Sequence, residues 1–227
     1  MTRKRPPAKK GSEKWIQLAV NDYPGVLYDH VAPQLHMKPS RISWLSPLRN
    51  DEYTEYSDQK FIDCLGLILK NRTLDRFWPK QGGPNWDGLA KTDRCQVLLV
   101  EAKAHIDEMK RPGSNAKDCG SIKTIALSLK KTQKFLDANQ TVDWSKYPHY
   151  QYANRLAHLY LLAELNGIDA YLLMIYFLND EHKKGPKCIK TWKEVVQKQH
   201  VDMGLRQDHR LSDRIVNLYL DVRELGG

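Results

Sequence analysis

The sequence predicts an α/β fold with a mixed central sheet. Two apolar runs have strand character: Gln96–His105 (QVLLVEAKAH) is expected to be a strand buried on both faces, and Asp169–Leu178 (DAYLLMIYFL) a central strand. Between them, Tyr150–Leu165 (YQYANRLAHLYLLAEL) is apolar almost all round, as in a buried helix. Strands that alternate with helices are typical of α/β proteins, and we expect the two strands to lie side by side.

The chain has 227 residues, enough for one domain with a small N-terminal appendage. Residues 1–12 are rich in basic side chains and proline, which predicts a disordered basic tail. Residues 13–51 are expected to be an N-terminal elaboration. It should be helical up to residue 37 with a break at Pro24-Gly25, and a short strand should follow within Arg41–Leu48. The main α/β domain should then span residues 52–227.

That domain is expected to begin with a helix from about Glu52 to Lys70. Ile62 and Leu65 belong to its inner stripe. Extending the stripe toward the N-terminus leads to Asp58 and Glu55. Both are readily explained as solvated acids of the first turn, where the helix dipole favours negative charge.

Further elements follow from the same patterns. A helix is expected at Ser121–Leu136 with Ile122 among its inward positions. Asn166-Gly167 should end the apolar helix, because glycine favours the left-handed conformation of a helix C-terminus. Another helix is expected at Trp192–His200, and Arg214–Asp221 should form a strand at or near the sheet edge.

The first buried strand carries Glu101 and Lys103 in its interior. Residues two apart in a strand point to the same side, so both share one face with His105. Burying a charge costs several kcal/mol unless the charge is paired or holds a metal. Two interpretations follow: a metal-assisted active site, or a structural ion pair of Glu101 with Lys103, with His105 as an alternative partner.

The segment upstream favours the active site. Trp86-Asp87-Gly88-Leu89 is followed by a polar turn at Lys91–Cys95, which predicts a hairpin that folds Asp87 back beside Glu101. The resulting pattern, Asp-x13-Glu-x-Lys, resembles the PD-(D/E)XK restriction-endonuclease-like nuclease superfamily. Trp86 departs from it, since it stands where the motif has proline. The resemblance covers roughly residues 52–180.

The resemblance implies a three-layer α/β/α core and a nuclease that hydrolyses phosphodiester bonds. Asp87 and Glu101 would hold Mg²⁺, with Mn²⁺ as an alternative, and Lys103 would assist the attacking water. In this superfamily the helix before the hairpin often adds an acidic residue, for which Glu55 is the candidate. A later helix often places a glutamine near the metal-bound water, and Gln151 matches that role.

Gln151 also belongs to a polar stripe on the otherwise apolar helix. Gln151, Arg155 and His158 recur at i, i+4 and i+7. A buried polar group without a partner costs ~1–3 kcal/mol, so the stripe must face something polar. It faces either the metal site or backbone groups where the helix meets the sheet.

The net charge and composition of the chain limit which partners it is expected to have. The net charge of +9 suits nucleic acid, with DNA expected rather than RNA, but five of the basic residues lie in the tail. No apolar run reaches the ~20 residues of a membrane span. The four cysteines are scattered, which favours reduced thiols and a cytoplasmic location.

The competing functions are a non-catalytic nucleic-acid-binding or interaction module that keeps the nuclease fold, and a structural α/β protein.

Overall fold

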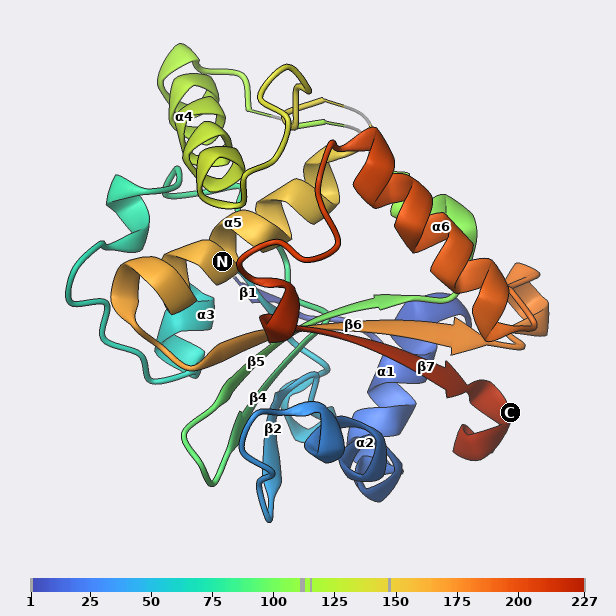
Figure 1. Cartoon of the computed structure of the whole chain (residues 1–227). Coiled ribbons are helices and arrows are strands. Elements are labelled where there is room, and N and C mark those ends of the chain that lie inside the picture. The colour runs from blue at the N-terminus through green and yellow to red at the C-terminus, as the bar shows by residue number, and fades with distance from the viewer. Residues whose placement is uncertain (1, 111–112, 115, 147, 227) are drawn as a thin grey trace.

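The computed structural model describes residues 2–110, 113–114, 116–146 and 148–226, and its centre is a five-stranded mixed sheet (Figure 1). The strands lie in the order β2-β4-β5-β6-β7. The pairs β2–β4 and β4–β5 are antiparallel, whereas β5–β6 and β6–β7 are parallel. The bounds are β2 Ile42–Ser46, β4 Gly88–Thr92, β5 Val97–Lys103, β6 Ala170–Leu178 and β7 Ile215–Asp221. The predicted α/β chain with a mixed sheet is therefore confirmed.

The two apolar runs form the centre of this sheet. Every residue of β5 and β6 is buried, and their parallel register begins with Val97 opposite Ala170. Successive side chains of β5 enter two different cores: Leu99 packs on one face and Leu98 on the other. The structure confirms the predictions of a doubly buried strand, of a central strand beside it, and of a last strand at the sheet edge.

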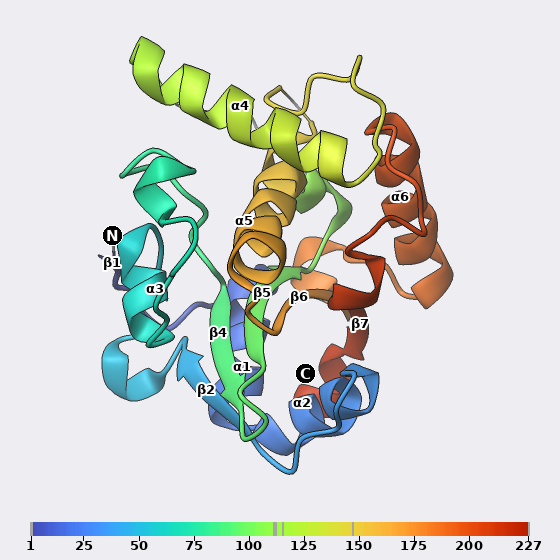
Figure 2. The same ribbon diagram turned by 60° about the vertical axis from the view of Figure 1, so that its left-hand side comes forward.

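Helices cover both faces of the sheet, as two views of the chain show (Figures 1 and 2). One face is covered by α1 (Gly11–Asn21) and α2 (Pro24–Val31), which contribute Trp15 and Leu27 to its core. On the other face α5 lies against β6, and α4 packs on α5. The helices that contribute to this second core are α3 Gln59–Cys64, α4 Cys119–Phe135, α5 Tyr150–Asn166 and α6 Ile189–Asp202. No helix within the described ranges is long and apolar enough to cross a membrane.

The ends of two helices have clear local causes. Gly167 has a φ of 63° and donates its N–H to Leu162 O, which ends α5 where the sequence predicted. Asp118 caps α4, since its Oδ1 accepts from Ser121 N at 2.8 Å. Ile122 is 48% exposed. Its prediction as an inward position is wrong, because the buried face of α4 begins one turn later.

The expected helix over Glu52–Lys70 is also wrong. A short strand, β3 (Glu55–Tyr56), and the six-residue helix α3 lie in its place. The backbone has a positive φ at Glu52 (50°) and at Asp58 (51°), which a right-handed helix does not contain. Glu55 therefore projects from a strand and not from a helix.

The N-terminal segment differs most from expectation. Its described part, from residue 2, is not a disordered tail: β1 (Thr2–Arg3) pairs antiparallel with β3, and Arg5 N donates to Glu52 O at 3.0 Å. Residues 13–51 are not a separate elaboration either. In that stretch β2 pairs with β4, and α1 covers one face of the central sheet. The chain on both sides of residue 51 thus builds the same sheet and cores.

Candidate active site

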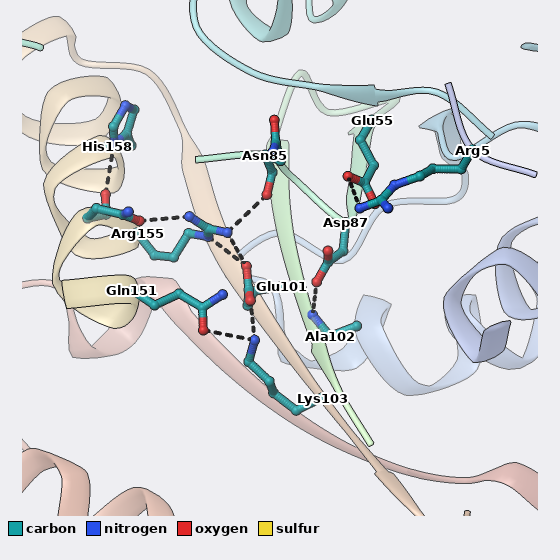
Figure 3. A network of polar contacts seen from close by, with 11 residues as sticks. Arg5, Glu55, Asn85, Asp87, Glu101, Ala102, Lys103, Gln151, Arg155 and His158 are labelled. Carbon is teal, nitrogen blue, oxygen red and sulfur yellow. Dashed lines mark hydrogen bonds and ion pairs between the residues drawn. The ribbon is translucent and has the colours of Figure 1, made fainter. Parts of the chain in front are cut away.

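The β4–β5 hairpin brings Asp87 to Glu101 and Lys103 (Figure 3). Asp87 directly precedes β4, and its N–H donates to Val100 O at 3.1 Å. Its Oδ2 accepts from Ala102 N at 2.8 Å, which fixes the carboxylate against β5. Glu101 and Lys103 share one face of β5 because side chains alternate along a strand. The three residues singled out in the sequence therefore lie together.

Glu101 and Lys103 form a buried ion pair. Lys103 Nζ donates to Glu101 Oε1, and it also donates to Gln151 Oε1 at 3.1 Å. The side chains of Glu101 and Lys103 are 3% and 5% exposed, so water screens their charges little. Gln151 reaches the pair from the first turn of α5. The structure thus brings the predicted glutamine to the predicted lysine.

Arg155 is the second cation at Glu101. Its Nε and Nη2 lie 2.6 and 2.5 Å from Glu101 Oε2. Nη2 also donates to Asn85 O at 2.9 Å, and Nη1 donates to Asn154 Oδ1 at 2.7 Å. Further along the stripe, His158 Nδ1 donates to Asn154 O at 2.8 Å. The polar stripe of α5 therefore contacts the Glu101–Lys103 pair through Arg155 and Gln151, and backbone carbonyls through Arg155 and His158.

The two acids of the site, the buried Glu101 and the partly exposed Asp87, have opposite pKa shifts. Burial, and next the neighbouring Glu101 carboxylate, raise the pKa of Asp87 from its ordinary 3.8 to about 8, although Lys103 opposes the rise. Burial by itself raises the pKa of Glu101 as well, but Arg155 and Lys103 together hold this pKa below its ordinary value. Near neutral pH, without a further cation, Asp87 is mostly protonated and Glu101 is ionised.

Glu55 lies close to these acids but has its own partner. Its carboxylate is bound by Arg5 Nη2 at 3.0 Å, and its side chain is 7% exposed (Figure 3). Burial raises the pKa of Glu55, and the Arg5 guanidinium opposes this rise. The Glu55 carboxylate adds to the negative charge around Asp87, whose pKa it also raises.

Asp87 and Glu55 line a cleft of about 1020 Å³. Its walls also carry cationic side chains from distant parts of the chain: Arg3, Arg5, Lys80 and Arg155. Glu101 and Lys103 line a much smaller cavity, which shares Gln151 and Arg155 with the cleft. Gln151 and Arg155 therefore stand at the boundary between the open cleft and the buried ion pair.

Asp87 and Glu101 offer the hard oxygen donors that Mg²⁺ prefers. Within the described ranges, no three His, Cys, Asp or Glu side chains group closely enough to hold a metal ion. A Mg²⁺ or Mn²⁺ ion here would therefore bind two carboxylates and complete its shell with water and phosphate oxygens, as Mg²⁺ commonly does. After burial, repulsion from Glu101 is the next cause that raises the pKa of Asp87, and a divalent cation between the two carboxylates would relieve that repulsion, so the donor set fits such an ion.

Sequence reasoning missed two residues of this site. Arg155 was noted in the polar stripe, and its spacing of four from Gln151 was the signal available for a role beside it. Arg5 was assigned to the tail, where no periodic pattern indicated its contact with Glu55.

No protein-family model, curated protein or solved structure matches this chain.

Proposed function

We propose that this protein is a metal-dependent nuclease that hydrolyses phosphodiester bonds in DNA, with Mg²⁺ or Mn²⁺ as its cofactor. One observation carries the proposal: Asp87, Glu101 and Lys103 meet beside a cleft whose lining carries both cationic and acidic side chains, in the order of the PD-(D/E)XK motif. A five-stranded mixed sheet with helices on both faces is compatible with the restriction-endonuclease-like three-layer core of that superfamily.

Each side chain has a role that suits its surroundings. Asp87 and Glu101 would hold the ion, which lowers the pKa of a bound water and neutralises charge on the phosphate. Asp87 gives up its proton on binding, because its carboxyl is mostly protonated in the metal-free protein near neutral pH. Lys103 Nζ, held by Glu101 and Gln151, is a positioned ammonium that orients the attacking water or stabilises the transition state.

The cleft suits a polyanionic substrate. Arg3, Arg5 and Lys80 line it together with Asp87, so a phosphodiester backbone in the cleft would meet cations on its way to the carboxylates. Glu55 has a supporting role: its ion pair holds Arg5 at the cleft wall. The net charge of +9 acts in the same direction at longer range.

A cleavage assay tests the proposal. Purified protein should degrade DNA with Mg²⁺ or Mn²⁺ and leave it intact in EDTA, and a parallel RNA substrate tests the preference for DNA. Asp87→Asn and Glu101→Gln should each abolish cleavage, because each removes one of the two anionic ligands. Asp93→Asn is the matched control, since Asp93 is an exposed carboxylate bound to Ser40. Full activity in the Asp87 or Glu101 variant would contradict the proposal.

A non-catalytic nucleic-acid-binding module is the second candidate. The observation in its favour is that both oxygens of Glu101 already have cationic partners, Lys103 and Arg155, as in a structural ion-pair cluster. Such a module would bind DNA without cutting it and would gain no stability from divalent ions.

A further inference from the structure

Arg155 and Lys103 together occupy both oxygens of the Glu101 carboxylate that a metal ion would bind. Its Nε and Nη2 both contact Glu101 Oε2, at 2.6 and 2.5 Å, while Lys103 holds Oε1. An ion that binds Glu101 therefore competes with one of these cations for the same negative charge. Figure 3 shows the two cations approaching Glu101 from different sides.

The two cations differ in which space each would enter if it moved away from Glu101. Arg155 lines the open cleft as well as the small cavity, whereas Lys103 lines the small cavity behind it. Arg155 also keeps contacts that do not involve Glu101: bonds to Asn85 O and Asn154 Oδ1, and a position 4.9 Å from the Trp86 ring. These contacts would hold the side chain near the cleft if its guanidinium exchanged Glu101 for another anion.

We propose that Arg155 exchanges Glu101 for a substrate phosphate when the metal site fills, so that metal and nucleic acid each strengthen the binding of the other. This inference rests on the proposed nuclease function. A buried guanidinium that loses its carboxylate needs another anion, because an unpaired buried charge is costly. A phosphate in the cleft can accept N–H bonds from the guanidinium in place of the carboxylate, because arginine binds both kinds of anion. Linkage then requires the effect to be reciprocal.

Binding measurements with Ca²⁺ test this coupling, because Ca²⁺ takes the same hard oxygen ligands. Calorimetry would compare wild type and Arg155→Met, each with and without a short DNA duplex, while a gel verifies that the duplex stays intact. Without DNA, Arg155→Met should bind Ca²⁺ about tenfold more tightly than wild type, a shift within the usual range for coupled sites. DNA should raise the Ca²⁺ affinity of wild type by a similar factor and should leave that of the variant unchanged.

Two further variants make the test specific. Arg214→Met removes a different Arg–Asp ion pair, with an N–O distance of 2.7 Å, at the start of β6, and should behave as wild type. Asn154→Ala removes one anchor of Arg155 and should shift Ca²⁺ affinity in the same direction as Arg155→Met, by less. If Arg155→Met does not fold, the Ca²⁺ affinity of Asn154→Ala tests the proposal in its place.

The failures of the two proposals are distinguishable. If wild type binds Ca²⁺, Mg²⁺ or Mn²⁺ but Arg155→Met binds no more tightly or keeps the DNA coupling, Arg155 is only a structural partner of Glu101 and this inference is wrong. If wild type binds none of these ions, the metal site fails and the proposed function fails with it.

Discussion

Asp87→Asn should stabilise the metal-free protein, and the gain should grow with pH. The folded state holds the pKa of Asp87 at about 8, against 3.8 for the ordinary carboxyl. Between these values the unfolded chain has released a proton that the folded chain keeps. Wild-type stability therefore falls as pH rises through this window, and the loss is complete above about pH 8. Asparagine never ionises, and its side-chain oxygen still accepts the N–H of Ala102.

The magnitude follows from the same shift. The rise of this pKa from 3.8 to about 8 corresponds to an upper limit of about 6 kcal/mol above pH 8, and to less than about 1 kcal/mol near pH 4. Relaxation of the site and entry of water reduce this limit. Each kcal/mol shifts the melting temperature of a domain of this size by about 2–4 °C, so even a fraction of the limit is measurable.

The assay is thermal or urea unfolding in EDTA at pH 5 and pH 8. Asp93→Asn is the control, and its effect on stability should have the opposite sign. Hydrogen bonds from Ser40 lower the pKa of this exposed carboxyl, so the folded state favours its ionised form and the substitution should destabilise the protein. In a Mg²⁺ series, wild type should gain about 2.7 kcal/mol at a hundredfold excess over the dissociation constant, and Asp87→Asn should gain much less.

One result would refute the reasoning. If Asp87 were needed only to compensate Lys103, its neutralisation would destabilise the protein at every pH. An Asp87→Asn variant that is less stable than wild type in EDTA at both pH values, together with no Mg²⁺ response in wild type, would eliminate the paired-carboxylate site.

Three further predictions follow from the same contacts. Lys103→Ala should lower turnover at saturating Mg²⁺ far more than it lowers Mg²⁺ affinity, because Nζ is proposed to act at the attacking water; the opposite pattern in kinetics and calorimetry would assign it another role. Arg5→Ala should destabilise the fold by about 1–3 kcal/mol in urea unfolding, since it leaves the buried Glu55 without its cation; wild-type stability would argue against this pairing of the N-terminal segment. DNA affinity, followed by fluorescence anisotropy, should fall linearly with salt concentration on logarithmic axes, and a flat response would exclude extensive phosphate contacts.

Long, regular sequence patterns were enough to identify the centre of this protein. The strands β5 and β6 are buried along their whole length and the helix α5 along most of it, so apolar residues dominate all three and the polar ones stand out. The turn before β5 adds the hairpin, and the hairpin brings Asp87 to Glu101. The meeting of Asp87, Glu101 and Lys103 could therefore be predicted from the sequence alone.

The remainder depends on contacts between distant parts of the chain. A two-residue strand such as β1 has no periodicity, and it exists because β3 pairs with it. Arg155 binds Glu101 across 54 residues, and Arg5 binds Glu55 across 50. The helix predicted near Glu55 does not form. Left-handed backbone positions fold that segment into a strand, which pairs with the N-terminal strand. The ion pairs that surround the carboxylates arise when packing excludes water and each buried charge must find a partner.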